Sequence, residues 1–339
     1  MDQGSGPLLA WHDPDEQRRW ILENKSREMR DKRTSLEEAV ARFVPWGSYL
    51  TMGGFGHVRT PMAAVYEIIR QGKRRLLMAG KPGVHDMDLL IAAGSVDRVE
   101  VAYGFGHELR GLSPASRRSA ERGEVQILTE WSNAAFEWRL KAAAMGLPFI
   151  PVRVMMGTDT LIHSSAKVVR DPFSEKLICL VPACYPDVAI IHVHQCDRFG
   201  NCRVSGGLSM DIDLARAARR LIITTEQIIP TEEIQREPER TLIPFYLTDA
   251  IAEVQYGSHP GNMPYLYYFD EEHIAKWLDL SKTSEGIQQY LDTYVYKPRG
   301  FSEYLESVGG EVKMMQLRLL ENREAENTHT QSMAGSSLR

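Results

Sequence analysis

Residues 48–80, SYLTMGGFGHVRTPMAAVYEIIRQGKRRLLMAG, carry the pattern that decides the fold. The apolar run SYLTM leads into a glycine-rich turn, and Pro61 then opens a helix whose Met62, Val65 and Ile69 lie on one face. A second apolar run, RRLLMAG, follows that helix. A strand, a helix and a strand at this short spacing predict a βαβ unit of a parallel sheet with helices packed on it.

The same alternation extends in both directions from this unit. Ser35 and Glu38 form a capping box before a first helix, LEEAVARFV. Further helices are expected in residues 87–94, 113–123, 132–146, 212–220, from 271 and near 301–310, and further strands in residues 97–104, 124–130, 149–155, 166–171, 176–183, 186–195 and after 220. The helix at 132–146 is apolar on two sides, so we expect it to be buried all round or covered by a partner protein.

The 339 residues are about twice the usual length of one domain, yet no internal repeat or interdomain linker divides them. We therefore expect one large domain over residues 34–310. The charged, weakly periodic residues 1–33 predict a mobile or helical N-terminal arm. The polar residues 311–339 predict a tail that is disordered from about residue 321.

Charge and cysteine content restrict the partners and the compartment. The chain has 40 Lys and Arg against 45 Asp and Glu, a net charge of −5, so it lacks the basic field that binding to nucleic acid or an anionic membrane requires. Its four cysteines are too few and too clustered to staple the chain, and no apolar stretch approaches the roughly 18 residues of a membrane span. The N-terminus lacks the pattern of a secretory signal, which indicates a cytoplasmic protein with reduced thiols.

Three glycine-rich loops follow three consecutive predicted strands: GGFGHVRTP (53–61), AGKPGVHDMD (79–88) and YGFGHELRG (103–111). Ligands bind at the carboxyl ends of the strands in open α/β sheets, so the three loops together predict a binding site. In the first loop we expect free backbone N–H groups to meet an anion or a developing oxyanion. This loop is not the dinucleotide fingerprint, because Arg59 occupies the third glycine position.

Polar side chains of the second and third loops are the candidates for chemistry: Lys81, His85, Asp86, Asp88, His107 and Glu108. The structural alternative for each loop is a tight turn without a ligand, in which Asp86 caps a short helix and Glu108 is a solvated carboxylate. Asp211 and Asp213 are expected to be charges at a helix N-terminus rather than ligands.

His192, His194 and Cys196 alternate along one face of a predicted strand, with Cys184 and Cys202 on either side. This arrangement permits a zinc site, but neither a C-x-x-C pair nor H-E-x-x-H spacing accompanies it. Core or interface histidines are therefore favoured, and no metal is expected.

A known family shows the same motifs in the same order: GGFGHVRTP, AGKPGVHDMDLLIAAG, VDRVEVAYGFGHE, AAAMGLPFIPVRVMMGTD, PDVAIIHVHQCDRFGNCRVSG and TDAIAEVQYGSHP. Over roughly residues 34–310 the chain resembles the α (A) subunit of family I coenzyme A-transferases, of the glutaconate CoA-transferase type. The resemblance implies an α/β fold with an open, mainly parallel sheet flanked by helices. It also implies that the partner is a homologous β subunit, that coenzyme A is a substrate and that no further cofactor is needed.

The resemblance implies nucleophilic catalysis across the two subunits. The acyl-CoA thioester is attacked by a glutamate of the β subunit, within a Ser-Glu-Asn-Gly type motif, to give a mixed anhydride and then an enzyme–CoA thioester, which a second carboxylic acid captures. That motif is absent from this sequence, so the chain is expected to be inactive alone. Glu108 occupies a place similar to the partner's nucleophile and is the catalytic candidate of this chain.

The resemblance also assigns a glycine loop and a loop beside the acyl pocket to substrate binding. With a neighbouring histidine, the residues expected to bind substrate are Gly53, Gly54, Phe55, Gly56, Lys81, Pro82, Gly83 and His107. Lys81 stands where the family is expected to have a small residue, and its charge favours a dicarboxylic acyl group. Gly54→Val is expected to abolish activity and leave assembly intact.

Two further classes of function stay open at this point. Some relatives on this scaffold are thought to cleave carbon–carbon bonds or decarboxylate acyl-CoA compounds, so an acyl-CoA hydrolase, a C–C lyase or a decarboxylase is the alternative. A non-catalytic ligand-binding module is the candidate from another class. It lacks support, because no helix-turn-helix or basic segment precedes the core.

Overall fold

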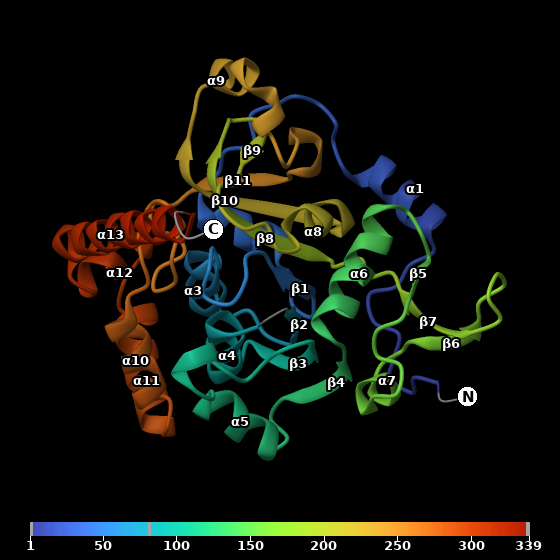
Figure 1. The fold of residues 1–339 in the computed structure, drawn as a ribbon. Coiled ribbons are helices and arrows are strands. Elements are labelled where there is room, and N and C mark those ends of the chain that lie inside the picture. Colours follow the sequence, from blue (N-terminus) through green and yellow to red (C-terminus); the bar gives the residue numbers. More distant parts are fainter. Residues whose placement is uncertain (1–2, 81–82, 337–339) are drawn as a thin grey trace.

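The computed structural model describes residues 3–80 and 83–336, with side chains as far as residue 323, and is built around a large twisted sheet (Figure 1). Its main strands lie in the order β11-β10-β8-β1-β2-β3-β4, and each neighbouring pair is parallel. Their bounds are β1 Tyr49–Met52, β2 Leu76–Gly80, β3 Val96–Val101, β4 Gln126–Glu130, β8 Val188–Cys196, β10 Arg220–Ile228 and β11 Ala250–Glu253. A short strand, β9 (Cys202–Arg203), pairs antiparallel with β8. The expected open, mainly parallel α/β sheet is confirmed.

The strand order reverses between β1 and β8. From β1 the chain runs outward through β2, β3 and β4, and it later returns to the other side of β1 as β8, β10 and β11. In doubly wound sheets, ligands bind beyond the carboxyl ends of the strands at such a reversal. The loop that begins at Gly53 leaves the sheet at this edge.

Helices cover both faces of the sheet. One core lies under α2 (Leu36–Phe43), α3 (Met62–Arg70), α4 (His85–Ala92) and α5 (Pro114–Glu121), and the other lies under α6 (Asn133–Ala144) and α8 (Asp211–Ala217). Alternate residues of β2 enter the two cores: Leu76 and Met78 join the first, and Leu77 and Ala79 the second. Burial on both faces explains why this strand reads as a continuous apolar run.

The C-terminal helices gather beside α3 and α4 at one side of the molecule (Figure 1). They are α10 (Glu271–Leu280), α11 (Ser284–Leu291), a π-helix (Asp292–Tyr296) and α12 (Phe301–Ser307). The buried hydroxyl of Tyr66 on α3 lies 3.1 Å from that of Tyr290 and 3.3 Å from that of Tyr304. This contact joins α11 and α12 to α3, and α10, which packs on α11, supplies two residues to the site.

Helix α6 was expected to be buried all round or covered by a partner. Phe136 and Leu140 are buried within this chain, against α8 and a second small sheet. Arg139 is also fully buried, where it pairs with Glu100 of β3. Lys141 stays exposed, so the helix is buried on two sides rather than all round, and the chain itself covers them.

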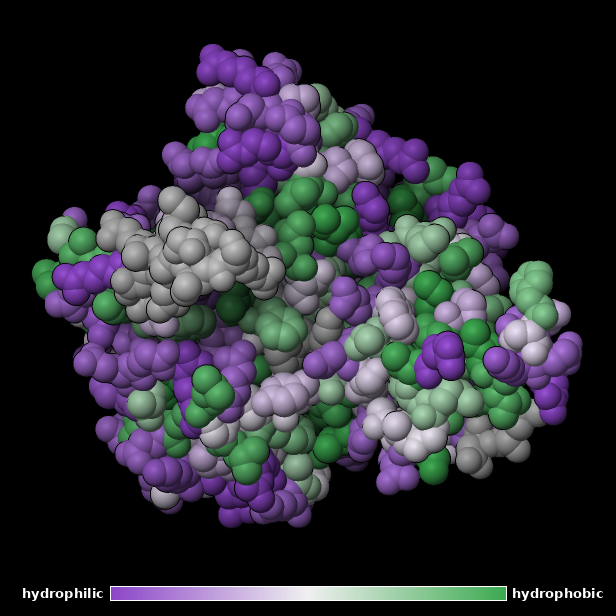
Figure 2. All heavy atoms as spheres, in the orientation of Figure 1, coloured by the Kyte–Doolittle hydropathy of each residue, from purple (hydrophilic) through white to green (hydrophobic). Residues whose placement is uncertain are grey.

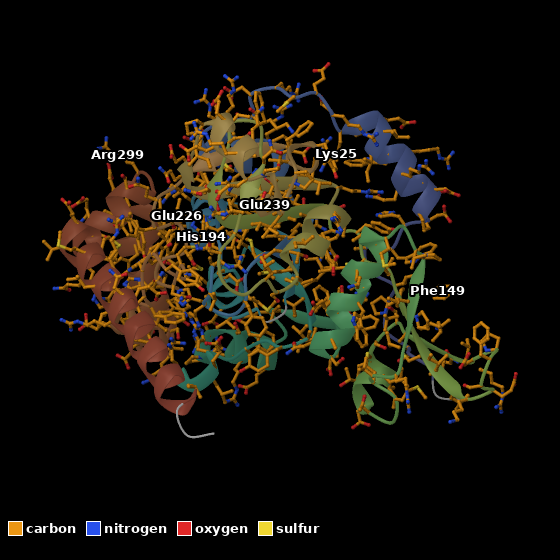
Figure 3. All side chains as sticks on the ribbon, turned by 45° about the horizontal axis from the view of Figure 1, so that its top comes forward. Lys25, Phe149, His194, Glu226, Glu239 and Arg299 are labelled. Atoms are coloured by element: carbon orange, nitrogen blue, oxygen red, sulfur yellow. The ribbon has the colours of Figure 1, made fainter. Side chains whose placement is uncertain are left out.

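The small sheet accounts for the β-rich middle of the sequence. Strands β5 (Phe149–Val152), β7 (Leu177–Pro182) and β6 (Lys167–Arg170) pair antiparallel in that order. Apolar surface gathers over this part of the molecule, at the right of Figure 2, and Phe149, labelled in Figure 3, is 44% exposed. The short helix α7 (Asp159–His163) connects β5 to β6, whereas α9 (Thr231–Arg236) follows β10 of the main sheet.

The N-terminal arm contains the helix that its sequence allowed, α1 (Pro14–Asn24). The residues before α1 are not free of the body: the amides of Gly4 and Gly6 donate to carbonyls of residues 166 and 164, and Trp11 donates to the carbonyl of Pro148. In the described residues the arm is therefore a packed strap along the small sheet.

The C-terminal segment differs from the expected polar tail. Helix α13 (Gly310–Ser336) begins where the tail was expected, and it buries Met314 and Leu317 against Met263 and Tyr267. Among the residues whose side chains the structure describes, the buried apolar ones of this helix lie in its first turns, between polar residues. None of the helices in the described ranges is long and apolar enough to cross a membrane.

Candidate functional site

The three glycine-rich loops meet at the carboxyl ends of β1, β2 and β3, as expected. The amide of Gly83 donates to the carbonyl of Tyr103, 3.0 Å away, which joins the second loop to the third. His57 Nε2 of the first loop lies 3.2 Å from His107 Nδ1 of the third. The parallel strands bring these loops together because they all end at the same edge of the sheet.

A buried chain of polar groups runs from His57 into the core. His107 Nε2 lies 3.2 Å from Asp88 Oδ2 on α4. Asp88 also accepts from Trp277 Nε1 of α10 at 2.7 Å and from the amide and hydroxyl of Ser116. Burial alone would raise the pKa of Asp88, but the hydrogen bonds from His107, Ser116 and Trp277 outweigh it and hold the carboxyl below its usual range. Asp88 is thus an ionised anchor for His107.

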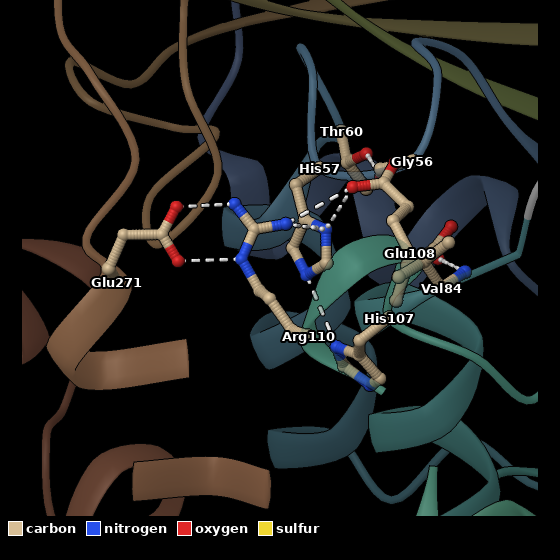
Figure 4. Close-up of polar contacts among 9 residues, drawn as sticks. Gly56, His57, Thr60, Val84, His107, Glu108, Arg110 and Glu271 are labelled. Carbon is tan, nitrogen blue, oxygen red and sulfur yellow. Dashed lines mark hydrogen bonds and ion pairs between the residues drawn. The ribbon is translucent and has the colours of Figure 1, made fainter. Parts of the chain in front are cut away.

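Glu108 lies at the open end of this chain, as Figure 4 shows. Its Oε2 lies 3.4 Å from His57 Nδ1 and 3.1 Å from Arg110. The hydrogen bond from His57 is the main cause that lowers the pKa of Glu108, and Arg110 adds to it. Arg110 in turn forms a bidentate pair with Glu271 of α10 at 2.5 and 2.6 Å. The carboxylate is one third exposed, so it is held from one side and open on the other.

The backbone at Glu108 is in the left-handed region, with φ of +59°. A non-glycine residue in that region costs on the order of 1–3 kcal/mol and persists only where its surroundings impose it, typically at functional sites. The carboxylate Oε1 lies so close above Gly56 that a Cβ there would collide with it. Glu108 is therefore more than the solvated carboxylate of the structural alternative, and its catalytic role stays a prediction.

The glycine loop offers fewer free amides than expected. The amides of Gly53, Gly54 and Phe55 donate to Ile190, Asp211 and Val58 respectively, so all three are used inside the protein. Because these residues are small, they would let a ligand come close to the backbone, but their amides would not donate hydrogen bonds to it. A Cβ on Gly54, whose φ is +83°, would collide with backbone, so Gly54→Val would disrupt the loop itself. Their part in binding substrate stays a prediction.

Arg59 is buried and held by structural contacts through Nη2, whereas its Nε and Nη1 have no hydrogen-bond partner among the described residues. It is 1% exposed and donates to Asp211 at 2.7 Å and to the carbonyl of Gly207 at 2.6 Å. Asp211 lies in the first turn of α8, as expected of a helix N-terminal charge, and also ties Gly54 and Arg59 to that helix. Sequence alone could not show this pairing, because more than 150 residues separate the partners.

The second loop is described only in part. Lys81 and Pro82 lie outside the described residues, so their assignment to the acyl pocket stays a prediction. Gly83 packs tightly on Met87, where a Cβ would clash. Asp86 lies inside the first turn of α4 rather than at its N-cap, which is Val84 and has no side-chain cap; its carboxylate accepts from the amide of Val84 at 2.9 Å, and burial raises its pKa to about 6.

Two histidines of the loop cluster are more central than the sequence indicated. His57 was not singled out, and His85 was one polar candidate among several, yet both are buried beside His107. The signal that could have found them is the repeated position of a histidine, since each of the three strand-end loops has a glycine-rich run followed by His57, His85 or His107.

The histidines of β8 are core residues, as favoured. Both ring nitrogens of His192 are engaged by Thr224 and Glu226 of β10, and those of His194 by Pro264 and Ser205. Figure 3 labels His194 and Glu226 in this crowded interior. A surface hollow of about 870 Å³, lined by Arg219, Arg220 and other residues, lies at the opposite edge of the sheet, where β8 and β10 begin.

Fold and loop cluster define a doubly wound α/β protein with a candidate ligand site at the carboxyl ends of its strands. Residues 33–254 match the family described as Coenzyme A transferase. The chain belongs to the Coenzyme A transferase family, which supports an enzyme rather than a non-catalytic binding module.

Relatives and solved structures agree with this assignment. The chain is 33% identical to the α (A) subunit of the glutaconate CoA-transferase of Acidaminococcus fermentans, over 81% of this chain and 91% of the relative. The crystal structure of that glutaconate coenzyme A-transferase matches with a TM-score of 0.79 and 31% identity, covering 84% of this chain and 95% of the other.

Two similar proteins are named for other activities. The cholesterol ring-cleaving hydrolase IpdA subunit of Mycobacterium tuberculosis is 30% identical over 79% of this chain and 94% of its own. A crystal structure of the decarboxylase AibA/AibB matches with a TM-score of 0.67 and 33% identity, covering 76% of this chain and 97% of the other.

Proposed function

We propose that the chain is the α subunit of a heteromeric CoA-transferase that moves coenzyme A between an acyl-CoA and a carboxylic acid. The observation that carries the proposal is the position of Glu108 on this family's scaffold. Its carboxylate is held by His57 and Arg110 at the meeting point of the strand-end loops, and it is one third exposed. A dicarboxylic acyl group is the favoured substrate class, on the charge of Lys81.

Transfer proceeds through two carboxylates and a thioester. The thioester carbonyl is attacked by a glutamate of the β subunit, the C–S bond breaks, and CoA leaves as a thiolate, so that a mixed anhydride remains. The thiolate then attacks the glutamyl carbonyl of that anhydride, which releases the donor acid and leaves a glutamyl–CoA thioester. The acceptor carboxylate runs the same steps in reverse and leaves as the new acyl-CoA.

Glu108 faces these reacting atoms from the α side in this proposal. Its hydrogen bonds to His57 and Arg110 both use Oε2, and Oε1 lies over Gly56. A carboxylate kept ionised in this way can act as a nucleophile or as a general base. The same geometry serves a second candidate function.

The second candidate is hydrolysis, carbon–carbon cleavage or decarboxylation of an acyl-CoA on this scaffold. The similarity to the IpdA hydrolase, at 30% identity, and to the decarboxylase AibA/AibB, at 33%, favours it, although the glutaconate CoA-transferase structure matches better, with a TM-score of 0.79 against 0.67 for the decarboxylase. In this case Glu108 would act as a base toward water or substrate, with no acceptor acid.

Mass spectrometry of the αβ complex, incubated with an acyl-CoA and an acceptor acid, separates the two candidates. Transfer predicts acyl-CoA of the acceptor and a glutamyl–CoA thioester on a β-subunit peptide. Loss of acyl-CoA without any acceptor product would establish the second candidate instead. A CoA thioester on the peptide that contains Glu108 would show that the nucleophile is Glu108 of this chain rather than a residue of the β subunit.

The proposal places the complex in the cytoplasm. All four cysteines are unpaired and buried, which is consistent with a reducing compartment.

A further inference from the structure

Three buried histidine rings, one from each strand-end loop, meet beneath Glu108. One ring nitrogen from each of His57, His85 and His107 lies within 4.8 Å of the others. The ring centroids are 5.2 Å apart for His57 and His107, 5.5 Å for His85 and His107 and 5.8 Å for His57 and His85. The three side chains are each about 1% exposed or less.

His85 is the ring that the hydrogen-bond network does not explain. Neither Nδ1 nor Nε2 has a hydrogen-bond partner among the described residues, although the side chain is almost completely buried. A neutral imidazole always carries one N–H donor, and leaving such a donor unpaired in the interior costs about 1–3 kcal/mol. Its neighbours are the other two histidines and the ring of Trp277, 6.0 Å away.

The other two rings are oriented from behind by carboxylates. His107 turns Nε2 to Asp88, and His57 turns Nδ1 to Glu108, so their remaining nitrogens, Nδ1 and Nε2, face one another at 3.2 Å. Metal-bound histidines typically donate their second N–H to a carboxylate in this way. When both rings donate outward, two lone pairs point into the space that His85 also borders.

We infer that His57, His85 and His107 bind a divalent transition-metal ion of the zinc class, in a site separate from the carboxylate chemistry of Glu108. Imidazole suits zinc, copper, iron and nickel. Tetrahedral zinc with Zn–N of 2.0–2.1 Å separates its nitrogens by about 3.3 Å, close to the spacing of His57 and His107. The third ring lies somewhat farther out, within 4.8 Å.

The fourth position of this ion would be left for water or a substrate oxygen, since no fourth His, Cys, Asp or Glu joins the group among the described residues. This inference departs from the expectation of no metal, and it does not depend on which acyl-CoA reaction is catalysed.

A metal-free arrangement of the same atoms exists and defines the test. If Arg110, 3.4 Å from His57 Nδ1, donates to that atom, His57 can donate to His107 and His107 to Asp88 without any cation. This chain of hydrogen bonds, the metal-free relay, gives His57 and His107 hydrogen-bond partners and leaves His85 without one. Metal binding and the relay therefore make opposite predictions for His85.

The first experiment measures zinc in the full-length chain, alone and with its β subunit, after removal of loosely bound ions by a weak chelator. We expect about one zinc per chain, and visible d–d bands of four-coordinate cobalt when Co²⁺ replaces it. A zinc content below about 0.1 per chain even after incubation with Zn²⁺ would overturn the proposal.

The second experiment compares His85→Phe, which fills the same volume without a ligand atom, with the exposed control His163→Gln. We expect His85→Phe to lose zinc at least tenfold and to unfold at a lower temperature than the zinc-loaded chain, while the control keeps its zinc. In the metal-free relay the phenylalanine removes an unpaired buried group and raises the unfolding temperature. Unchanged zinc content in His85→Phe, or a higher unfolding temperature of this variant, would contradict the metal site. If the variant does not fold, the cobalt spectrum of the unmodified chain shows whether the site binds metal.

Discussion

The carboxylate of Glu108 combines a strained backbone with a fixed side chain, and each supports a role in the reaction. Its φ of +59° is maintained by the surrounding loop, and its Oε2 is held by His57 and Arg110. We expect Glu108→Gln to lower the kcat of the αβ complex by about 10²- to 10⁴-fold, because the amide cannot act as base or nucleophile. KM for the acyl-CoA should change little. A matched control is Glu303→Gln, which replaces a carboxylate of α12 far along the sequence. Equal kcat values for Glu108→Gln and for this control would show that Glu108 takes no part in the chemistry.

His194 makes the stability of the fold depend on pH. Burial lowers its pKa from 6.5 to about 4, and the charged or titratable groups that act on it are His192, Arg59 and Glu226. Between pH 4 and 6.5 the unfolded chain binds a proton at this position and the folded chain does not, so stability falls as the pH is lowered through that range. The 2.5-unit difference corresponds to about 3 kcal/mol.

Urea unfolding of His194→Gln at several pH values checks this expectation. Glutamine can still meet the amide of Ser205 or the carbonyl of Pro264, but it cannot titrate. We expect its unfolding free energy to vary less than that of the unmodified chain between pH 4 and 6.5. His273, whose burial lowers its pKa to about 3, contributes the same slope to both proteins and cancels in the difference. Parallel curves for the two proteins would show that His194 does not titrate in this way.

At the scale of elements, the loop after β1 couples to the loop after β3 through Gly56 and Glu108. A Cβ at Gly56 would collide with the end of the Glu108 side chain, which is flexible, whereas a Cβ at Gly54 would collide with backbone. We expect Gly56→Ala to displace the carboxylate and lower kcat at least tenfold, with about 1 kcal/mol lost in stability from the φ of +63°.

A double-mutant cycle tests that coupling. In the background of Glu108→Ala, Gly56→Ala should cost much less activity than it does alone, because the side chain that it displaces is gone. Circular dichroism and urea unfolding of each variant separate this effect from disruption of the loop. Additive losses of activity would mean that Gly56 acts independently of Glu108.

Helix α13 is anchored by its first turns. Leu317 is 3% exposed among Met263, Tyr267 and Met314, and its carbonyl accepts from the amide of Tyr268. We expect Leu317→Ala to lower the free energy of unfolding by about 2–4 kcal/mol. Leu319→Ala, at a position 54% exposed, should change it by less than about 0.5 kcal/mol. Equal, small effects of the two substitutions, measured by urea unfolding, would mean that α13 does not contribute to the stable body.

Elements that are determined by patterns within a few residues were predictable from the sequence. Elements that depend on contacts between residues far apart in the chain were not. The βαβ unit at residues 48–80 and the capping box at Ser35 follow from patterns within a few residues, and the structure confirms both. Helix α13 was expected to be a tail because Met263 and Tyr267, against which it buries Met314 and Leu317, lie about 50 residues earlier in the chain. The packed arm is hidden for the same reason, since the contacts of Gly4 and Gly6 lie about 160 residues away.

At the scale of the whole molecule, the meeting of the three loops that form the candidate site was predictable, but the pairing of their side chains was not. Three strand-end loops located the site because parallel strands end at one edge. The commitment of Arg59 to Asp211 and the meeting of His57 with His107 depend on how loops and helices fold back across the sheet. The residue types in one loop do not indicate which residues of another loop they contact. The roles of single residues therefore could not be predicted from the local sequence pattern.

The rim of the site is apolar, which fits a chain whose partner must reach the substrate. Four exposed apolar side chains surround Glu108 along the first and third loops: Phe55, Tyr103, Leu109 and Leu112. Leu109, directly after Glu108, is fully exposed, and Leu112 is 62% exposed. A cluster of exposed apolar side chains around a charged centre is typical of a protein interface, and in the proposed complex the β subunit would cover this rim.

Substitution of Leu109 tests that placement of the β subunit. We expect Leu109→Asp to weaken α–β association by about tenfold or more, because a charge would be buried in the apolar contact. Val312→Asp, on α13 at a position 70% exposed, provides a matched control that should leave association unchanged. Sedimentation or titration calorimetry of the purified subunits gives the Kd, and the far-ultraviolet spectrum of the free chain verifies folding. If Leu109→Asp associates as tightly as the unmodified chain, the β subunit docks elsewhere, and its nucleophile cannot share the pocket of Glu108.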